Sequence, residues 1–140
     1  MRVVILPTEQ EASDFAADFI EKLIIEKENA VLGLATGSSV LLTYEALIKK
    51  YQSGEMSFKN ITTFNLDEYI GLQPDHTQSY RHYMNRKLFN HIDIDHKKTY
   101  IPECFNKDYE SSCENYESKI RQNGGIDLQL LGIGTNGHIG

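Results

Sequence analysis

The stretch AVLGLATGSSVLLTYEALI, residues 30–48, decides the fold because its hydrophobic pattern changes period in the middle. Ala30–Ala35 is a short apolar run, typical of a buried strand. A polar glycine loop, Thr36–Ser39, follows it. Beyond the loop, apolar residues recur at helical steps, at Val40, Leu41, Tyr44, Leu47 and Ile48. The stretch therefore predicts a strand, a loop of a size that suits a phosphate, and a helix.

The same alternation continues along the chain. Thr8 and Glu11 match a capping box. The helix that they open is expected to have an apolar face of Ala12, Phe15, Ala16, Phe19, Ile20, Leu23 and Ile24. Further strands are expected at Val3–Leu6, Ile61–Phe64, Tyr100–Ile101 and Ile126–Leu131, and further helices at Gln78–Phe89 and Tyr109–Arg121. This order predicts an α/β fold with a doubly wound, mostly parallel, Rossmann-like sheet. No repeat or linker divides residues 1–140, so a single domain is expected.

Composition argues against several classes of protein. The net charge of −6 is unlike that of a nucleic-acid-binding domain, which needs clustered Lys and Arg. Cys104 and Cys113 have no His partner at zinc-ligand spacing, so no metal site is expected. Two free thiols suit a reducing cytosol, and we find no signal peptide and no apolar run long enough to cross a membrane. We expect a cytoplasmic protein with no membrane partner.

Three loops that follow expected strands carry polar groups, and a parallel sheet would bring them to one edge. In Thr36, Gly37, Ser38 and Ser39, small residues and the amides of a helix N-terminus suit a phosphate, although an ordinary turn capped by Ser explains the same residues. Asp67 and Glu68 are adjacent in NLDEYIG, residues 65–71, so their side chains are expected to point apart and do different jobs. One can be a general base, and a solvated acidic turn is the alternative.

The third loop is GIGTNGHIG, residues 132–140, where the chain stops. Its glycines match GxGxxG, yet the helix and the acidic residue of a dinucleotide site do not follow, which argues against that cofactor. His138 can shuttle protons near neutral pH, and Asn136 can orient its ring. A histidine in a loop can equally have no such role.

Taken together, these loops resemble one known family. LGLATGSS (32–39), TTFNLDEYIGL (62–72) with DHTQSY (75–80), and GGIDLQLLGIGTNGHIG (124–140) closely resemble glucosamine-6-phosphate deaminases, in order and over the whole chain. The resemblance implies a sugar-phosphate isomerase fold and an enzyme without a cofactor. It would convert glucosamine 6-phosphate and water to fructose 6-phosphate and ammonia in amino-sugar catabolism. It implies a sugar phosphate as the partner, and a homo-oligomer is possible.

The resemblance also implies residue roles. Asp67 matches the base that moves a proton from C2 to C1, His138 matches the residue that opens the sugar ring, and Thr36–Ser39 match a phosphate-binding loop. Asn136 stands where many relatives have Asp. Because an amide can orient an imidazole without adding charge, we expect a more nearly neutral His138 ring.

The family continues beyond the position of Gly140 with a Glu and with basic residues that hold the phosphate. We therefore expect residues 1–140 to be the N-terminal portion of the domain, with little or no deaminase activity alone and a tendency to associate. Two other functions share this architecture. A 6-phosphogluconolactonase-like hydrolase would keep the phosphate loop without needing the acid pair, and a non-catalytic sugar-phosphate sensor would keep the loop while losing Asp67 and His138.

Overall fold

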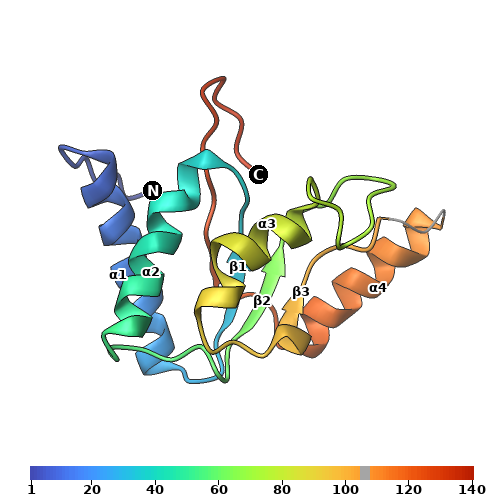
Figure 1. Ribbon diagram of the computed structural model, residues 1–140, viewed down its shortest axis with the longest axis horizontal. Coiled ribbons are helices and arrows are strands. Elements are labelled where there is room, and N and C mark those ends of the chain that lie inside the picture. Colours follow the sequence, from blue (N-terminus) through green and yellow to red (C-terminus); the bar gives the residue numbers. More distant parts are fainter. Residues whose placement is uncertain (105–107) are drawn as a thin grey trace.

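Apolar runs that end in polar loops build one parallel sheet (Figure 1). The computed structural model describes residues 1–104 and 108–140. Within those residues the sheet has four strands in the order β3-β2-β1-β4. They are β1 (Val31–Leu34), β2 (Thr62–Asn65), β3 (Thr99–Tyr100) and β4 (Leu128–Gln129), and every pairing is parallel. The expected mostly parallel α/β sheet is confirmed.

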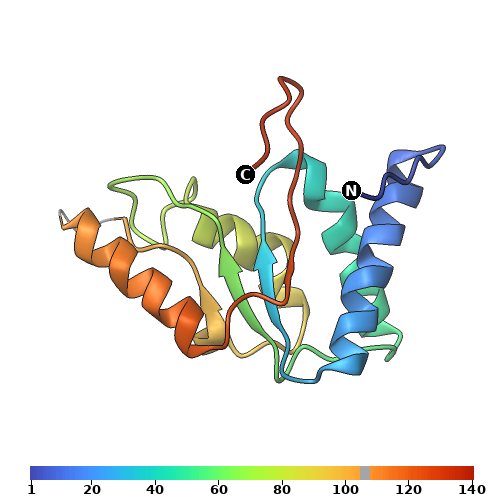
Figure 2. The ribbon, with the colours of Figure 1, turned by 180° about the vertical axis from the view of Figure 1, so that it is seen from behind.

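Helices connect these strands. The described α-helices are α1 (Glu9–Glu26), α2 (Leu41–Gln52), α3 (Tyr80–Lys87) and α4 (Tyr109–Gln122), with short 3₁₀ turns η1 (Ser38–Val40), η2 (Phe89–His91) and η3 (His96–Lys98). α1 begins as its capping motif predicts, because the Thr8 hydroxyl accepts the Glu11 amide at 3.1 Å. In Figures 1 and 2, α3 crosses one face of the sheet and α4 lies on the opposite face.

The larger core lies between β1 and the helices α1, α2 and α3. Its buried residues include Ile20 of α1, Leu32 and Leu34 of β1, Leu47 of α2 and Met84 of α3. The opposite face of the sheet carries a smaller aromatic cluster. Phe64 of β2 stacks on Tyr100 at 4.8 Å between ring centroids and meets Tyr116 of α4 edge-on at 5.7 Å. Helices thus pack against both faces of the sheet, as in a doubly wound fold.

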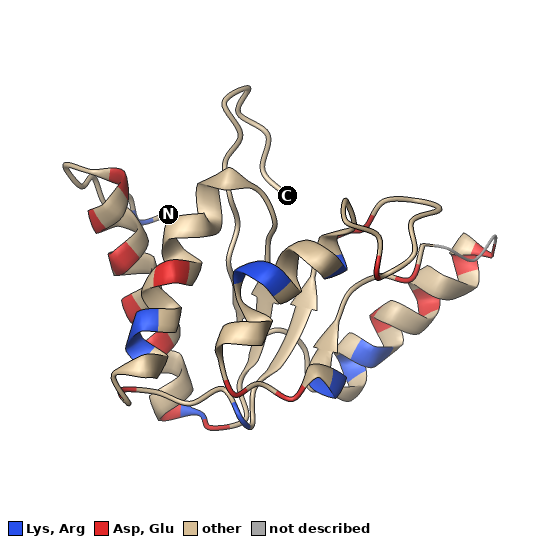
Figure 3. Ribbon diagram, viewed as in Figure 1, with Lys and Arg blue, Asp and Glu red and all other residues tan. Residues whose placement is uncertain are grey.

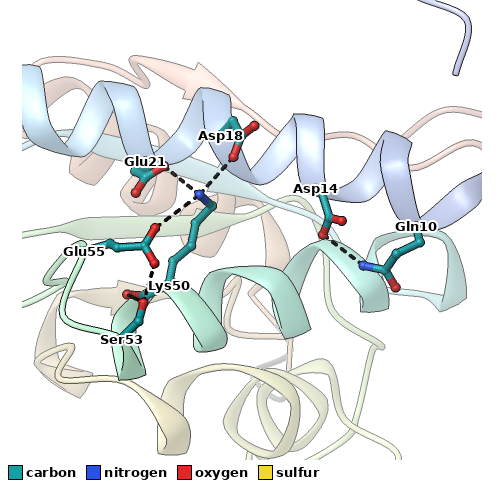
Figure 4. Close-up of polar contacts among 7 residues, drawn as sticks. All are labelled: Gln10, Asp14, Asp18, Glu21, Lys50, Ser53 and Glu55. Carbon is teal, nitrogen blue, oxygen red and sulfur yellow. Dashed lines mark hydrogen bonds and ion pairs between the residues drawn. The ribbon is translucent and has the colours of Figure 1, made fainter.

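An ion-pair cluster joins α1 to α2 (Figure 4). The Lys50 ammonium of α2 lies 2.7 Å from a Glu21 carboxylate oxygen and 2.9 Å from one of Asp18, both on α1, and 3.6 Å from one of Glu55. These carboxylates raise the pKa of Lys50 through hydrogen bonds with Glu21 and Asp18. The cluster holds the helix that follows the first loop against α1.

The strand order reverses direction at β1, between its neighbours β2 and β4. The chain runs from β1 outward to β2 and β3, and then returns to the other side of β1 as β4. The loops after β1 and β4 therefore leave neighbouring strands in opposite directions. Parallel sheets bind ligands in the crevice that forms at such a switch point.

Three expectations are wrong or incomplete. The strand at Val3–Leu6 is absent, and Val3 and Ile5 are 68% and 90% exposed, because no described strand runs beside this segment to pair with it. Of the face expected for α1, Ile20 and Ile24 are buried, whereas Phe19 is 49% exposed and the helix buries Ser13 and Ala17 instead. The strand expected at Ile126–Leu131 pairs only over Leu128–Gln129.

Candidate functional site

The three polar loops meet around one cavity of about 420 Å³ at the carboxyl ends of the strands. Most of the residues singled out from the sequence line it, whereas Gly37 does not. The lining residues are Ala35, Thr36, Ser38, Ser39, Leu66, Asp67, Tyr80, Gly132, Ile133, Gly134, Thr135, Asn136, His138 and Gly140. The predicted convergence of the loops is therefore present in the structure.

The loop after β1 turns at a glycine and leads directly into helical turns. Gly37 has a φ of +109°, which favours glycine, and η1 and α2 begin directly after it. Neither helix has a side-chain cap, so the explanation of Ser38 and Ser39 as ordinary caps is wrong. Within the described parts of the chain, their hydroxyls form no hydrogen bond with protein, and they line the cavity beside a helix N-terminus.

Two tyrosines, the buried Tyr44 and the half-buried Tyr83, fix the backbone of this loop. The Tyr83 hydroxyl of α3 donates to the Gly37 carbonyl at 2.6 Å, and the Tyr44 hydroxyl of α2 donates to the Ala35 carbonyl. Both carbonyls are thereby held by hydrogen bonds from helices that pack beside the loop. The loop is held in one shape before any ligand binds, which lowers the entropic cost of binding.

Asp67 and Glu68 point apart, as expected for neighbours at a strand end. Asp67 lines the cavity, and partial burial raises the pKa of its carboxyl, with the negative charge of Glu68 adding to the effect. Glu68 instead accepts the backbone amides of Tyr69, Tyr80 and Arg81 at 2.9, 2.8 and 3.0 Å. Asp67 therefore keeps a free carboxylate at the cavity, whereas that of Glu68 is taken up by the protein.

His138 and Asn136 lie together on a hairpin that rises above the sheet (Figure 1). Asn136 Oδ1 lies 2.6 Å from His138 Nδ1 and 3.3 Å from the His138 amide nitrogen. Since the amide nitrogen is a donor, Oδ1 is the accepting oxygen, and Nδ1 carries the ring proton. The other ring nitrogen, Nε2, is left free to accept a proton.

Two glycines allow this hairpin to pack closely. A Cβ on Gly134 would lie 2.5 Å from the Cε1 and Nδ1 atoms of His138, and one on Gly132 would lie 2.3 Å from Ser39 Oγ. Gly132 and Gly134, which matched a dinucleotide-binding pattern, thus have a different structural role. They bring the imidazole and the serine loop close to the backbone after β4.

Tyr80 also lines the cavity, although the sequence indicated only that it belongs to a helix. Its hydroxyl donates to that of Tyr69 at 3.1 Å. Burial and the Tyr69 hydrogen bond raise the pKa of Tyr80 to about 12, so the phenol stays protonated near neutral pH. The signal in the sequence that could have indicated this is Ser79, because it caps α3 and puts Tyr80 at the first helical position, next to the preceding loop.

The cavity has an unusual charge distribution. Among its described lining residues, Asp67 is the one acidic group, and Lys and Arg are absent. Figure 3 shows Lys and Arg on the helices and at the lower edge of the sheet, away from the hairpin. Within the described residues, no three His, Cys, Asp or Glu side chains gather in a way that could hold a metal ion. An anion here would meet hydroxyls and backbone amides.

The parallel sheet and its polar cavity at the switch point define an α/β protein that binds a small molecule beyond the carboxyl ends of its strands. The sequence profile of one family, glucosamine-6-phosphate isomerases/6-phosphogluconolactonase, matches residues 8–140. The chain belongs to this family.

Two curated relatives are similar over the whole chain. The glucosamine-6-phosphate deaminases of Colwellia psychrerythraea and a Thermoanaerobacter species are 52% and 53% identical to it. The alignments cover all of this chain but 53% and 55% of the relatives. The chain therefore spans about half the length of the curated relatives it matches.

Solved structures agree with the fold. A structure described as a monomeric glucosamine-6-phosphate deaminase has a TM-score of 0.95 at 47% identity, over 99% of this chain and 58% of that one. The 6-phosphogluconolactonase of Thermotoga maritima has a TM-score of 0.73 at 29% identity, over 91% of this chain and 58% of that one. The chain is thus more similar to the first of these two structures.

Proposed function

We propose that the protein carrying this chain is a glucosamine-6-phosphate deaminase. One observation carries the proposal: Asp67 and the Asn136–His138 pair face one cavity together with an anion-suited loop. The reaction needs all three groups, because the phosphate of the sugar must be bound, the sugar ring must be opened, and the carbon next to the new carbonyl must be deprotonated.

His138 would open the ring. With the proton on Nδ1 held by Asn136, Nε2 takes the proton of the anomeric hydroxyl and returns it to the ring oxygen. The hemiacetal C–O bond breaks, and C1 becomes an aldehyde. That carbonyl acidifies the hydrogen on C2 and prepares the next step.

Asp67 would then act as the base. Its carboxylate removes the C2 proton, the C–H electron pair forms a C1–C2 double bond, and the π electrons of the C1 carbonyl move to its oxygen, which takes a proton from solvent. The proton held by Asp67 is then delivered to C1 while the nitrogen lone pair forms a C2–N double bond. The amine at C2 becomes an iminium, and water adds to C2 and releases ammonia, leaving fructose 6-phosphate. The raised pKa of Asp67 supports this role, since a base with a pKa closer to the working pH transfers protons more efficiently.

Thr36–Ser39 would hold the phosphate. The free hydroxyls of Ser38 and Ser39, with the amides at the start of η1, offer several donors to its oxygens. Binding energy from the phosphate, remote from C1 and C2, would position the reacting carbons against Asp67.

The proposal also covers the reaction class, the metabolic role and the location of the protein. The reaction consumes water and makes the protein a hydrolase of amino-sugar catabolism, downstream of N-acetylglucosamine, with a cytoplasmic location. Within the described residues, no helix is both long and apolar enough to cross a membrane. A homo-oligomer is compatible with the proposal, although the structure with a TM-score of 0.95 is described as monomeric.

A lactonase is the second candidate, favoured by the structural similarity to the Thermotoga maritima enzyme. It would use the same phosphate loop. Hydrolysis of a lactone does not require a carboxylate beside C2, so Asp67 argues for the deaminase.

Parallel assays separate the two candidates. The purified protein carrying this chain would be given glucosamine 6-phosphate in one assay and 6-phosphogluconolactone in the other. We expect ammonia and fructose 6-phosphate in equal amounts from the first and no enzymatic acceleration of the second. Lactone hydrolysis without ammonia release would overturn the proposal in favour of the lactonase. Stoichiometric binding of the amino sugar phosphate without turnover would indicate a sensor.

A further inference from the structure

Asp67 lies on a turn whose two ends are anchored to other elements. At its start, the Tyr116 hydroxyl of α4 donates to the Asn65 carbonyl at 2.6 Å. At its end, the Gly71 amide donates to the Cys104 carbonyl at 2.8 Å. These two contacts leave the middle of the turn, where Asp67 lines the cavity, without an anchor of its own.

Glu68 provides that middle anchor. Its Oε1 accepts the amides of Tyr69 and Tyr80, and its Oε2 accepts the amide of Arg81. Two of these donors belong to the first turn of α3, whose amides have no helical partner. A carboxylate at this end of a helix also interacts favourably with the helix dipole. Glu68 therefore contributes through its charge, which interacts with the helix dipole, and through its two oxygens, which accept the three amides.

We propose that Glu68 is a positioning residue, whose carboxylate ties the turn that carries Asp67 to the start of α3 and so places Asp67 and Tyr80 on the same wall of the cavity. The kinetic part of this inference rests on the proposed deaminase function. The packing contact between the Tyr69 and Tyr80 rings, 4.7 Å between centroids, supports the same link.

Several titratable groups face Asp67. Glu68 is next to it in the turn, and Tyr80 of α3 and His138 of the hairpin line the same cavity. Burial raises the pKa of the Cys104 thiol, and the charges of Glu68 and, less strongly, Asp67 add to the effect. The side chain of Arg81 is directed elsewhere, since it donates to the Thr99 hydroxyl and carbonyl, both at 2.7 Å. Glu68 is therefore the neighbouring charge that acts on the Asp67 carboxyl.

Two substitutions separate the charge from the geometry. Glu68→Gln removes the charge and replaces one accepting oxygen by an amide that cannot accept the Arg81 proton. Glu68→Asp keeps the charge but shortens the side chain by one methylene, so that it no longer spans the turn and α3. Glu45→Gln is the matched control, because Glu45 is exposed on α2 and forms no ion pair or side-chain hydrogen bond with the described residues.

Two measurements test the proposal without turnover, in the protein carrying this chain. In NMR titrations of the Asp67 carboxyl carbon, we expect a lower pKa in Glu68→Gln than in the unsubstituted protein and in Glu45→Gln. In hydrogen-exchange measurements, we expect the Tyr80 and Arg81 amides to exchange faster in both Glu68 variants, because their acceptor is lost or displaced. If neither the titration nor the exchange changes, the proposal is overturned.

Turnover tests the consequence for catalysis. We expect kcat to fall about 10- to 100-fold in Glu68→Asp, since a misplacement of about 1 Å can cost about 100-fold. KM should stay within about twofold, because the phosphate loop is untouched. Asp67 works deprotonated, so its lower pKa in Glu68→Gln should move the acid limb of the pH–rate profile to lower pH.

If the NMR changes occur but the unsubstituted protein releases no ammonia, the positioning role stands and the proposed function fails. Glu68 variants with unsubstituted kcat would contradict the positioning role.

Discussion

At the scale of the residue, Gly134 shows how closely the hairpin is packed around the imidazole. Its φ is not positive, so alanine suits its backbone, but the added Cβ would lie 2.5 Å from the His138 ring. We expect Gly134→Ala to displace the ring and to lower kcat about 100-fold, the usual cost of about 1 Å at a reacting group. Steady-state assays of ammonia release check this.

Gly54→Ala is the control for that substitution. Gly54 has a φ of +80° in the turn after α2, outside the cavity, so alanine there strains the backbone by about 1 kcal/mol. We expect a lower melting temperature with an unchanged kcat, the opposite of Gly134→Ala. An unchanged kcat in Gly134→Ala would show that the position of the ring does not matter.

Asn136 allows a test of the proton shuttle by pH. Asn136→Asp would place a carboxylate beside His138 Nδ1, where the amide oxygen now lies at 2.6 Å. A negative charge there favours the protonated imidazole. We expect the limb of the pH–rate profile that belongs to His138 to move to higher pH. A profile that does not move would remove His138 from the titrating step.

Sequence patterns predicted the cavity residues where a loop follows a strand directly. Thr36, Asp67 and His138 converge because parallel strands deliver such loops to one edge of the sheet. The roles of Glu68 and Tyr80 could not be predicted in the same way. They depend on where the first turn of α3 lies relative to the end of β2, which is a tertiary property.

At the scale of the element, the Lys50 cluster offers a test of how α1 and α2 are joined (Figure 4). We expect Lys50→Met to lower the free energy of unfolding by about 1 kcal/mol, since it leaves three carboxylates without their cation. Lys22→Met is the control, because its pair with Glu26 is exposed and 3.8 Å long, and it should cost at most about 0.5 kcal/mol. Urea denaturation measures both.

The pH dependence of this effect has a definite sign. The pKa of Lys50 is raised above the usual lysine value of 10.5, so its contribution is fully present below that value and is lost as the pH rises through the folded-state pKa. We expect the difference between the unsubstituted protein and Lys50→Met to be constant from neutral pH to about pH 10 and to shrink above it. A difference that does not depend on alkaline pH or on salt would point to lost packing instead.

The elements themselves were predictable where hydrophobic period and capping agree. The start of α1 follows from Thr8, and Ile24 is buried as expected, but the burial of Ala17 rather than Phe19 depends on the position of α2. Val3–Leu6 has the composition of a strand, yet a strand forms only with a neighbour to accept its hydrogen bonds.

At the scale of the whole molecule, the α/β class followed from alternating periods, whereas the order β3-β2-β1-β4 did not. Strand order depends on which edge of β1 each later strand joins. That choice creates the switch point and brings the Thr36–Ser39 loop beside the hairpin of His138. The proposed function therefore depends on the cavity working as one unit.

Removal of the proposed base tests the central claim most directly. Ammonia release from glucosamine 6-phosphate would be compared between the protein carrying this chain and its Asp67→Asn variant, which keeps the size of the side chain but cannot take a proton. We expect kcat to fall by about 100- to 10,000-fold, the usual contribution of a general base, with substrate still bound. An Asp67→Asn variant that releases ammonia at the unsubstituted rate would contradict the account.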